Sequence, residues 1–277
     1  MRALDAGLIG TLYRAACLAE LEALKPGNVH AYAAGHRMVV ADFVTSADVS
    51  APELARAGAG VGERVRAGVA ATLAAVAQNT NLGILLLCAP LAVAAERGQS
   101  IATVLDTLDA ADSEAVFAAI RLANPGGLGR TDRHDVTADA PLSLRDAMEE
   151  AASRDRIARA YDTGFSDIPA IGLPALAEAR VAGLDPTWCT TAIHLAYLRS
   201  VPDSHIARKA GTSAAENVRQ EVDAMLAHLD LAGRPLETLL ALDDSLKARG
   251  LNPGTSADFT VATLFWDALT AAGAPLA

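Results

Sequence analysis

Apolar residues along this chain recur every three to four positions, which is the spacing of one face of a helix. In residues 4–24, for example, Leu8, Leu12 and Leu18 fall along one side. Few β-branched clusters and an aromatic content of 4% also favour helix over sheet. We therefore predict an all-α fold, with a single multi-helix globular domain over residues 1–277. Further helices are predicted at residues 39–50, from residue 52, at 99–122 as a pair, at 144–162, 174–183, 186–200, 213–231 and 235–249, and from residue 254 onward.

A polar cluster leads directly into the most apolar segment of the chain. Asn79, Thr80 and Asn81 are followed by residues 82–95, which carry no charge, and residues 69–77 upstream are almost as apolar. A helix that is apolar on every face is a buried one, so we predict a buried central helical hairpin. Because a single Asn or Thr suffices as an N-cap, two interpretations stay open: helix capping alone, or the polar floor of a pocket.

Glycines 58, 60, 62 and 68 do not match a dinucleotide-binding fingerprint. No strand is predicted before them, and the GxGxxG spacing is absent. We interpret them as sites of close helix packing or of a bend.

Composition excludes several classes of protein. The net charge of -10 argues against a nucleic-acid partner and against an anionic membrane surface. The three cysteines are widely spaced in apolar contexts, which indicates buried thiols in a reducing compartment. No signal peptide is evident, and the longest apolar run is too short to span a bilayer. We expect a cytoplasmic protein, and the apolar content permits a homodimer without requiring one.

Residues 25–30, with the sequence Lys-Pro-Gly-Asn-Val-His, end the first predicted helix and form the first candidate site. Pro26 disfavours a helical residue before it, and Gly27 frees the backbone. Lys25 and His30 beside a flexible glycine are a plausible clamp for phosphate or carboxylate. The alternative is an ordinary turn.

A second candidate segment, residues 201–211, concentrates polar chemistry at a turn-to-helix junction. Asp203, His205, Arg208 and Lys209 all lie within it. Asp203 is also an acceptable N-cap, although an adjoining pair of cations is not needed for capping.

Two further segments remain. Residues 252–258, with the sequence Asn-Pro-Gly-Thr-Ser-Ala-Asp, open the last predicted helix. Residues 124–136 form the longest irregular stretch, which is either a lid or a solvated connection.

Taken in order, these motifs resemble the triphosphoribosyl-dephospho-CoA synthase family. The resemblance rests on Glu22 with residues 25–30, on Asn79 to Gly83, on residues 202–211 and on residues 252–258. It implies an all-helical fold and a transferase that moves the ribose triphosphate of ATP to dephospho-CoA and releases adenine.

The chain departs from the family pattern at one motif. Synthases of the family carry Asn-Thr-His-Lys-Gly where this chain has Asn-Thr-Asn-Leu-Gly, and Leu82 offers no cation to a triphosphate. The variant is similar to a divergent branch from archaea and methylotrophic bacteria. An alternative function is therefore a step in the biosynthesis of a C1-carrier coenzyme of the methanopterin or methanofuran type. A further alternative is a different enzyme on the same scaffold, for example one that catalyses a condensation with diphosphate as leaving group. A non-catalytic helical binding protein is the rival class.

Ribosyl transfer passes through an oxocarbenium-like state, which calls for acids near the sugar and donors for the phosphates, commonly with Mg²⁺ between them. We therefore expect Mg²⁺, and ATP or another phosphorylated small molecule as the donor substrate. The predicted catalytic acids are Glu22, Asp42, Asp203 and Asp258, of which Glu22 and Asp203 are the predicted metal ligands. The predicted substrate-binding residues are Lys25, Asn28, His30, Asn79, Thr80, Asn81, His205, Arg208 and Lys209. All of them are expected to converge on one cleft.

Overall fold

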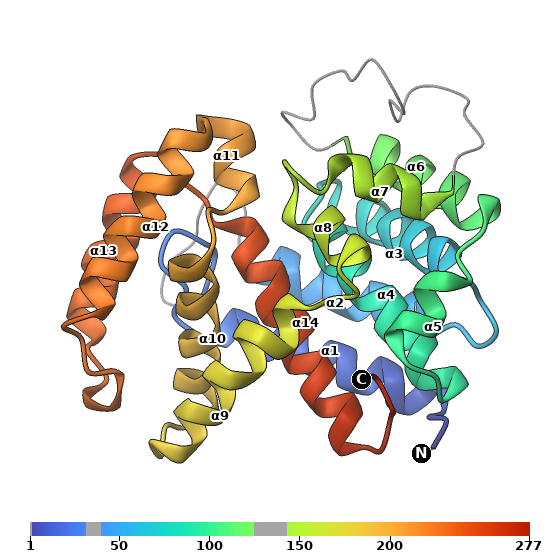
Figure 1. Ribbon diagram of the computed structural model, residues 1–277, viewed down its shortest axis with the longest axis horizontal. Coiled ribbons are helices and arrows are strands. Elements are labelled where there is room, and N and C mark those ends of the chain that lie inside the picture. The colour runs from blue at the N-terminus through green and yellow to red at the C-terminus, as the bar shows by residue number, and fades with distance from the viewer. Residues whose placement is uncertain (1, 32–39, 125–142) are drawn as a thin grey trace. The chain divides into compact units, whose positions relative to one another are not determined.

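The computed structural model describes residues 2–31, 40–124 and 143–277 (Figure 1). Every regular element in these ranges is a helix, so the predicted all-α class is confirmed. The described helices group into two compact units. The first comprises Met1–Ala16, Asp42–Ser166 and Phe265–Ala277, and the second comprises Cys17–Ala41 and Asp167–Leu264. The organisation as a single domain stays a prediction. In these described ranges no helix is both long and apolar enough to cross a lipid bilayer.

The first unit is built around a buried helix. Its elements are the beginning of α1 (Ala6–Glu22), nearly all of α2 (Val40–Leu54), α3 (Val61–Val76), α4 (Leu82–Arg97), α5 (Ile101–Asp106), α6 (Ala110–Ala123), α7 (Leu144–Ala151), α8 (Arg156–Asp162) and the end of α14 (Gly254–Ala271). Helix α4 is buried continuously from Ile84 to Ala95. This confirms the buried arm of the predicted hairpin, whereas its partner α3 leaves Ala70, Ala74 and Ala75 exposed.

A proline inside α4 has a specific compensating contact. Pro90 has no backbone N–H, so the carbonyl of Leu86, four residues earlier, lacks its usual helical donor. The Tyr161 hydroxyl from α8 donates to that carbonyl at 2.7 Å. The buried helix therefore contains a proline without leaving an unpaired acceptor.

Glycines let α3 approach its neighbours closely, as predicted. A Cβ at Gly62 would lie 2.4 Å from the backbone oxygen of Asp112 in α6, and one at Gly68 would lie 2.7 Å from Leu85 in α4. The Gly62 N–H also donates to the Asp112 carboxylate at 2.7 Å. These two glycines are therefore packing residues, not part of a nucleotide-binding loop.

The second unit contains the end of α1, α9 (Leu173–Val181), α10 (Pro186–Ser200), α11 (Ser204–Ala210), α12 (Thr212–Leu226), α13 (Leu236–Ala248) and the beginning of α14. A π-turn at Ile168–Gly172 precedes α9, and a 3₁₀ turn at Leu231–Gly233 precedes α13. Its apolar core comes from four helices and the segment after α1, and includes Leu24, Leu195, Leu198, Ile206, Val218, Val222, Leu239, Leu242 and Leu246.

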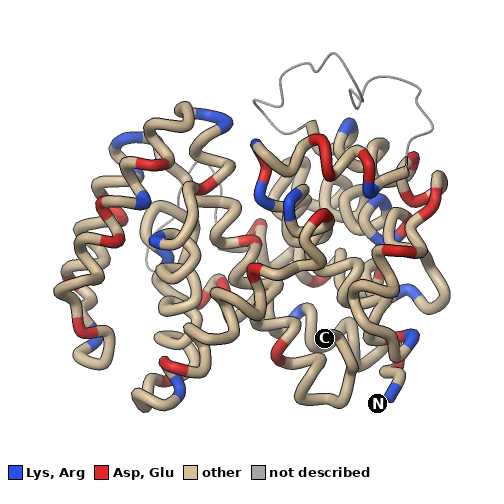
Figure 2. The backbone as a smooth tube through the Cα atoms, in the orientation of Figure 1, with Lys and Arg blue, Asp and Glu red and all other residues tan. Residues whose placement is uncertain are grey.

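Charges on the outer helices of this unit are interspersed in sign, as Figure 2 shows for α12 and α13. Exposed ion pairs such as Arg199–Asp223 at 2.6 Å and Arg249–Glu221 at 2.9 Å join neighbouring helices. Exposed pairs of this kind contribute about 1 kcal/mol or less each, so the core leucines carry the stability.

Three predicted boundaries were wrong. Helix α2 continues through Pro52 to Leu54, although a break was predicted there. The single helix predicted at 144–162 is two helices, because Asp155 caps a new helix by accepting from the N–H groups of Ile157 and Ala158. The loop predicted at 165–174 contains the π-turn and the start of α9.

Candidate functional site

The loop at residues 25–30 is locked into the second unit by its glycine. Gly27 has φ +84°, a conformation that favours glycine, and a Cβ there would lie 2.7 Å from Pro253 Cδ. Its N–H donates to Asp243 Oδ1 of α13 at 2.8 Å. A side chain at position 27 would therefore separate the loop from the segment that it packs against.

Lys25 is fully buried at the start of this loop. Its Nζ forms an ion pair with Glu20 and donates to the Val29 carbonyl at 2.6 Å. Burial lowers the pKa of Lys25, while the charges of Glu20 and Asp258 oppose that shift. Burial likewise raises the pKa of Glu20 against the effect of Lys25. The Lys25 head of the predicted anion clamp is thus occupied by internal partners.

His30, Asp243 and Lys247 form a tight cluster at the end of the loop. His30 Nε2 lies 3.3 Å from Asp243 Oδ2, and Lys247 Nζ lies 2.9 Å from the same oxygen. The two nitrogens are 3.5 Å apart. Burial alone would raise the pKa of Asp243, but hydrogen bonds from His30, Lys247 and Gly27 outweigh it and hold that pKa below its ordinary value. The carboxylate therefore stays ionised while almost completely buried.

The first and last motifs meet through two asparagines. Asn28 Nδ2 donates to Asn252 Oδ1 at 2.9 Å, and Asn28 Oδ1 accepts from the Val29 N–H at 2.7 Å. Both side chains are buried. Residues 25–30 and 252–258 are therefore neighbours, as the sequence motifs predicted.

The segment at 201–211 joins the same region through Asp203, the N-cap of α11. Asp203 Oδ1 accepts from the N–H groups of His205 and Ile206, and Oδ2 accepts from Ser256 N at 2.7 Å and Ser256 Oγ at 2.8 Å. Thr255 adds contacts to Ser204 and to the His205 N–H at 3.0 and 3.1 Å. Three of the four motifs thus meet within one unit.

The predicted Mg²⁺ ligands do not fit a metal site. A carboxylate has about four acceptor positions, and all four of Asp203 are used by protein donors. Burial also raises the pKa of Asp203, against those hydrogen bonds. Glu22 is exposed at the end of α1. Among the described residues, no three His, Cys, Asp or Glu side chains are grouped to hold a metal ion.

The remaining predicted residues of this unit are more accessible. Asp258 is half-buried in α14, close enough for its charge to act on Lys25. His205 and Arg208 are half-buried, and Lys209 is exposed in the last turn of α11. Burial and the neighbouring charge of Arg208 lower the pKa of Lys209.

In the first unit, the polar run before α4 does more than cap that helix. Asn79 Oδ1 accepts from the Leu82 N–H at 3.2 Å and so caps α4. Thr80 Oγ1 instead lies 2.6 Å from Ser46 Oγ, and Asn81 Nδ2 donates to Thr72 Oγ1 at 2.9 Å. One residue is therefore a cap, and the other two tie α2 and α3 to the start of α4.

Asp42 belongs to the same unit and accepts from Gln78 Nε2 at 3.1 Å. The participation of Asp42, Asn79, Thr80 and Asn81 in one site with the second unit stays a prediction. A lid was one interpretation of residues 124–136. Residues 125–136 lie outside the described residues.

Sequence inspection missed three residues of the second-unit cluster. Asp243 and Lys247 are four residues apart, which is the spacing of an ordinary surface ion pair on a helix. Glu20 resembles a surface acid in the sequence. His194, in α10, is fully buried. Burial lowers the pKa of His194 to about 3; the charge of Lys25 adds to this shift and the Pro26 backbone opposes it.

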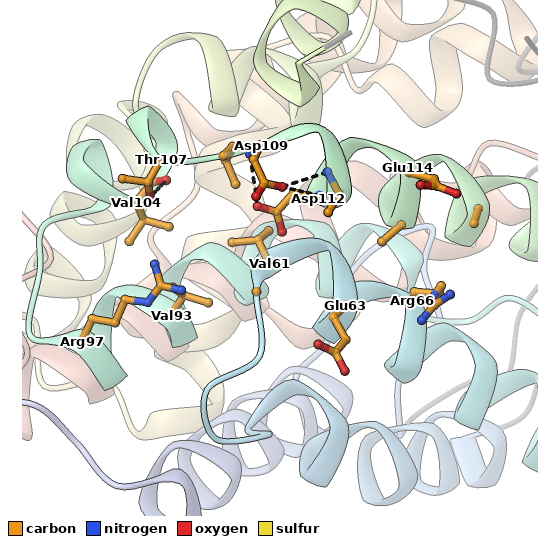
Figure 3. A pocket seen from close by; sticks show the side chains of 15 residues that line it. Val61, Glu63, Arg66, Val93, Arg97, Val104, Thr107, Asp109, Asp112 and Glu114 are labelled. Atoms are coloured by element: carbon orange, nitrogen blue, oxygen red, sulfur yellow. Dashed lines mark hydrogen bonds between the residues drawn. The ribbon is translucent and has the colours of Figure 1, made fainter. Parts of the chain in front are cut away.

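A pocket of about 530 Å³ lies within the first unit, between α3, α4, α5 and α6 (Figure 3). Arg66 and Arg97 line it together with several acids. Two of those acids, Asp109 and Asp112, form the capping box of α6. The pocket presents mixed charge, and no predicted site residue lines it.

Fold and site together define a helical protein in which three of the four motif segments meet at buried polar contacts. A similar fold is found in the crystal structure of a protein from Archaeoglobus fulgidus that is provisionally named a triphosphoribosyl-dephospho-CoA synthase. It matches with a TM-score of 0.63 at 24% identity, over 82% of this chain and 97% of that one. At this identity the likeness shows a shared fold.

The chain belongs to the family described as ATP:dephospho-CoA triphosphoribosyl transferase, whose model matches residues 6–275. The resemblance inferred from the motifs is thereby confirmed. Curated relatives include a provisionally named 2-(5''-triphosphoribosyl)-3'-dephosphocoenzyme-A synthase from Stutzerimonas stutzeri, 30% identical over 64% of this chain and 59% of the relative. A synthase of the same name from Pectobacterium atrosepticum is 30% identical over 36% of this chain and 32% of the relative. The matched regions thus span about a third to three fifths of these relatives.

Replacement of Asp203 should destabilise the second unit more than loss of an ordinary cap. Asp203→Ala leaves the Ser256 N–H and hydroxyl buried without their acceptor, so we expect a loss of about 3 kcal/mol or more in unfolding free energy. Asp185→Ala removes a more exposed N-cap in the same unit and should cost about 1 kcal/mol. Urea denaturation of both variants measures the difference, and equal losses would contradict the structural role of Asp203.

His194 should make the protein sensitive to mild acid. Its pKa falls from 6.5 to about 3 on folding, so the unfolded chain binds more protons between these values. Stability is therefore fully present above pH 6.5 and falls as the pH drops through this window, by up to about 1.4 kcal/mol per pH unit. His194→Phe should flatten the decline in denaturation midpoint between pH 7.5 and 5, whereas replacement of the exposed His228 by Gln should not. A wild-type slope in His194→Phe would rule the histidine out as the cause.

Proposed function

We propose that the chain transfers the triphosphoribosyl group of ATP to the hydroxyl of dephospho-CoA. The observation that carries this proposal is the match of the family model to residues 6–275, nearly the whole chain. The names of the curated relatives support it, because they state the product of that transfer. The three motif segments that meet in the second unit all lie within the matched range.

The chemistry is a substitution at the anomeric carbon of the ribose. The bond from this carbon to the adenine nitrogen breaks, and a bond to the acceptor oxygen forms. The acceptor hydroxyl gives up its proton, and adenine leaves carrying one, so atoms and charge balance. A site for this step must bind phosphates, stabilise positive charge on the sugar, and hold a base near the acceptor.

Asp258 is the best-placed acid for the last two tasks. It is half-buried, whereas Asp203 is buried, and its charge acts on Lys25. In the proposal it stabilises the developing cation and takes the acceptor proton. Asp203 is instead a positioning residue, because it holds α11 against α14. Glu22 and Asp42 stay predicted catalytic residues.

In the proposal, basic residues of the same segments bind the phosphates. His30 closes the loop at residues 25–30, and Arg208 and Lys209 lie in the last turn of α11. Lys25 adds positive potential from within the core. Mg²⁺ has no role in the proposal, since the residues predicted to hold it do not fit such a site.

The acceptor is the finer part of the proposal. Leu82, where family members have a cation, is buried at the start of α4 and contributes to the core of the first unit. A difference in acceptor from dephospho-CoA would leave the donor chemistry, and hence adenine release, intact.

Purified protein incubated with ATP and dephospho-CoA should release adenine and form an adduct heavier by one triphosphoribosyl group. Liquid chromatography follows adenine, and mass spectrometry identifies the adduct. Asp258→Asn should lower the rate by about 10² or more, which is the scale of general-base catalysis. The exposed Asp244→Asn on α13 is the matched control and should retain wild-type activity.

Parallel reactions replace dephospho-CoA with pterin or furan coenzyme intermediates. Adenine release with one of these and not with dephospho-CoA would overturn the acceptor and keep the donor. No adenine release with any acceptor would overturn the proposed function.

A further inference from the structure

Asp243 uses its two carboxylate oxygens for two different purposes. Oδ1 accepts the Gly27 N–H at 2.8 Å, which holds the backbone of the loop at residues 25–30. Oδ2 lies 3.3 Å from His30 Nε2 and 2.9 Å from Lys247 Nζ, which holds two side-chain heads. The Asp243 side chain is 1% exposed, so both sets of contacts form away from water.

We propose that Asp243 is a positioning residue that shapes the loop through Gly27 and sets His30 and Lys247 side by side as a paired contact for the phosphates of the donor substrate. This inference rests on the proposed function for the identity of the ligand. It adds Lys247 as a substrate-binding residue and Asp243 as the group that prepares the site.

The backbone contact matters because the loop has little other choice of conformation. Gly27 adopts φ +84°, and a Cβ there would lie 2.7 Å from Pro253 Cδ and 3.0 Å from Leu246 Cδ1. Without Oδ1 its buried N–H would lose its acceptor, at a cost that buried groups avoid by moving. The loop that carries Lys25 and His30 would then shift.

The side-chain contacts matter because one carboxylate oxygen of Asp243 holds both nitrogen heads. Lys247 Nζ and His30 Nε2 are 3.5 Å apart, a separation that the ionised carboxylate between them stabilises. The Lys247 side chain is 17% exposed, whereas the His30 side chain is fully buried. Paired nitrogen donors at one point suit the oxygens of a phosphate chain.

Two substitutions separate the two purposes. Asp243→Asn keeps an oxygen for the Gly27 N–H but removes the negative charge that holds the two heads. Asp243→Ala removes both contacts. Asp244→Asn changes the adjacent exposed carboxylate of the same helix and is the matched control.

The first readout needs no activity. Amide hydrogen exchange of the peptide spanning residues 24–31 should speed up about tenfold or more in Asp243→Ala, and stay within about threefold of wild type in Asp243→Asn and Asp244→Asn. Unchanged exchange in Asp243→Ala would overturn the loop contact. If Asp243→Ala does not fold, comparison of Asp243→Asn with wild type still decides the second part.

The second readout is the steady-state kinetics of adenine release. Asp243→Asn should raise the KM for ATP about fivefold or more with kcat within about threefold, because the phosphate contact is misplaced while the loop is intact. Lys247→Met should do the same without affecting exchange in residues 24–31. A wild-type KM in either variant would overturn the paired phosphate contact.

The outcomes also separate this inference from the proposed function. Absence of adenine release by the wild-type protein overturns the proposed function and, with it, the phosphate role of the pair. Faster exchange in Asp243→Ala would still establish Asp243 as the residue that shapes the loop.

Discussion

The hydrogen bond from the Gly27 N–H to Asp243 is the contact on which the arrangement of the second unit depends. A loop that enters a helical core carries backbone donors and acceptors that must find partners there. Asp243 supplies one acceptor to the loop, and the amide of Asn252 supplies another to Asn28. Once these are in place, the buried Lys25 can close on Glu20 and on the Val29 carbonyl. The loop at residues 25–30 is thus fixed by polar contacts inside the second unit.

The same principle explains how the other two motifs reach the loop. Asp203 caps α11 with one oxygen and binds the beginning of α14 through Ser256 with the other. Because a buried carboxylate is energetically costly unless it is fully hydrogen-bonded, this bridge fixes the alignment of α11 with the beginning of α14. It gives Asp203 a structural role, whereas Asp258, further along α14, is the acid to which the proposal assigns the catalytic role. Neighbouring acids in sequence motifs can therefore have different roles.

Sequence patterns predicted the helical class and the motif segments well, because helical spacing and turn residues are local properties. They also predicted the burial of α4, although the proline at position 90 needed the distant Tyr161 as compensation. They could not predict that Asp243 is buried, since burial of one helical position depends on neighbours far along the chain. Asp203 was predicted as a metal ligand because its sequence motif does not reveal that protein donors occupy both of its carboxylate oxygens.

The central claim is that the segments around residues 25–30 and 243–258 bind the nucleotide. Photolabelling with 8-azido-ATP, followed by peptide mapping, tests it most directly. The account predicts labelled peptides from these two segments, with protection by excess ATP. Labelling confined to peptides that line the pocket of the first unit, such as those with Arg66 or Arg97, would contradict it.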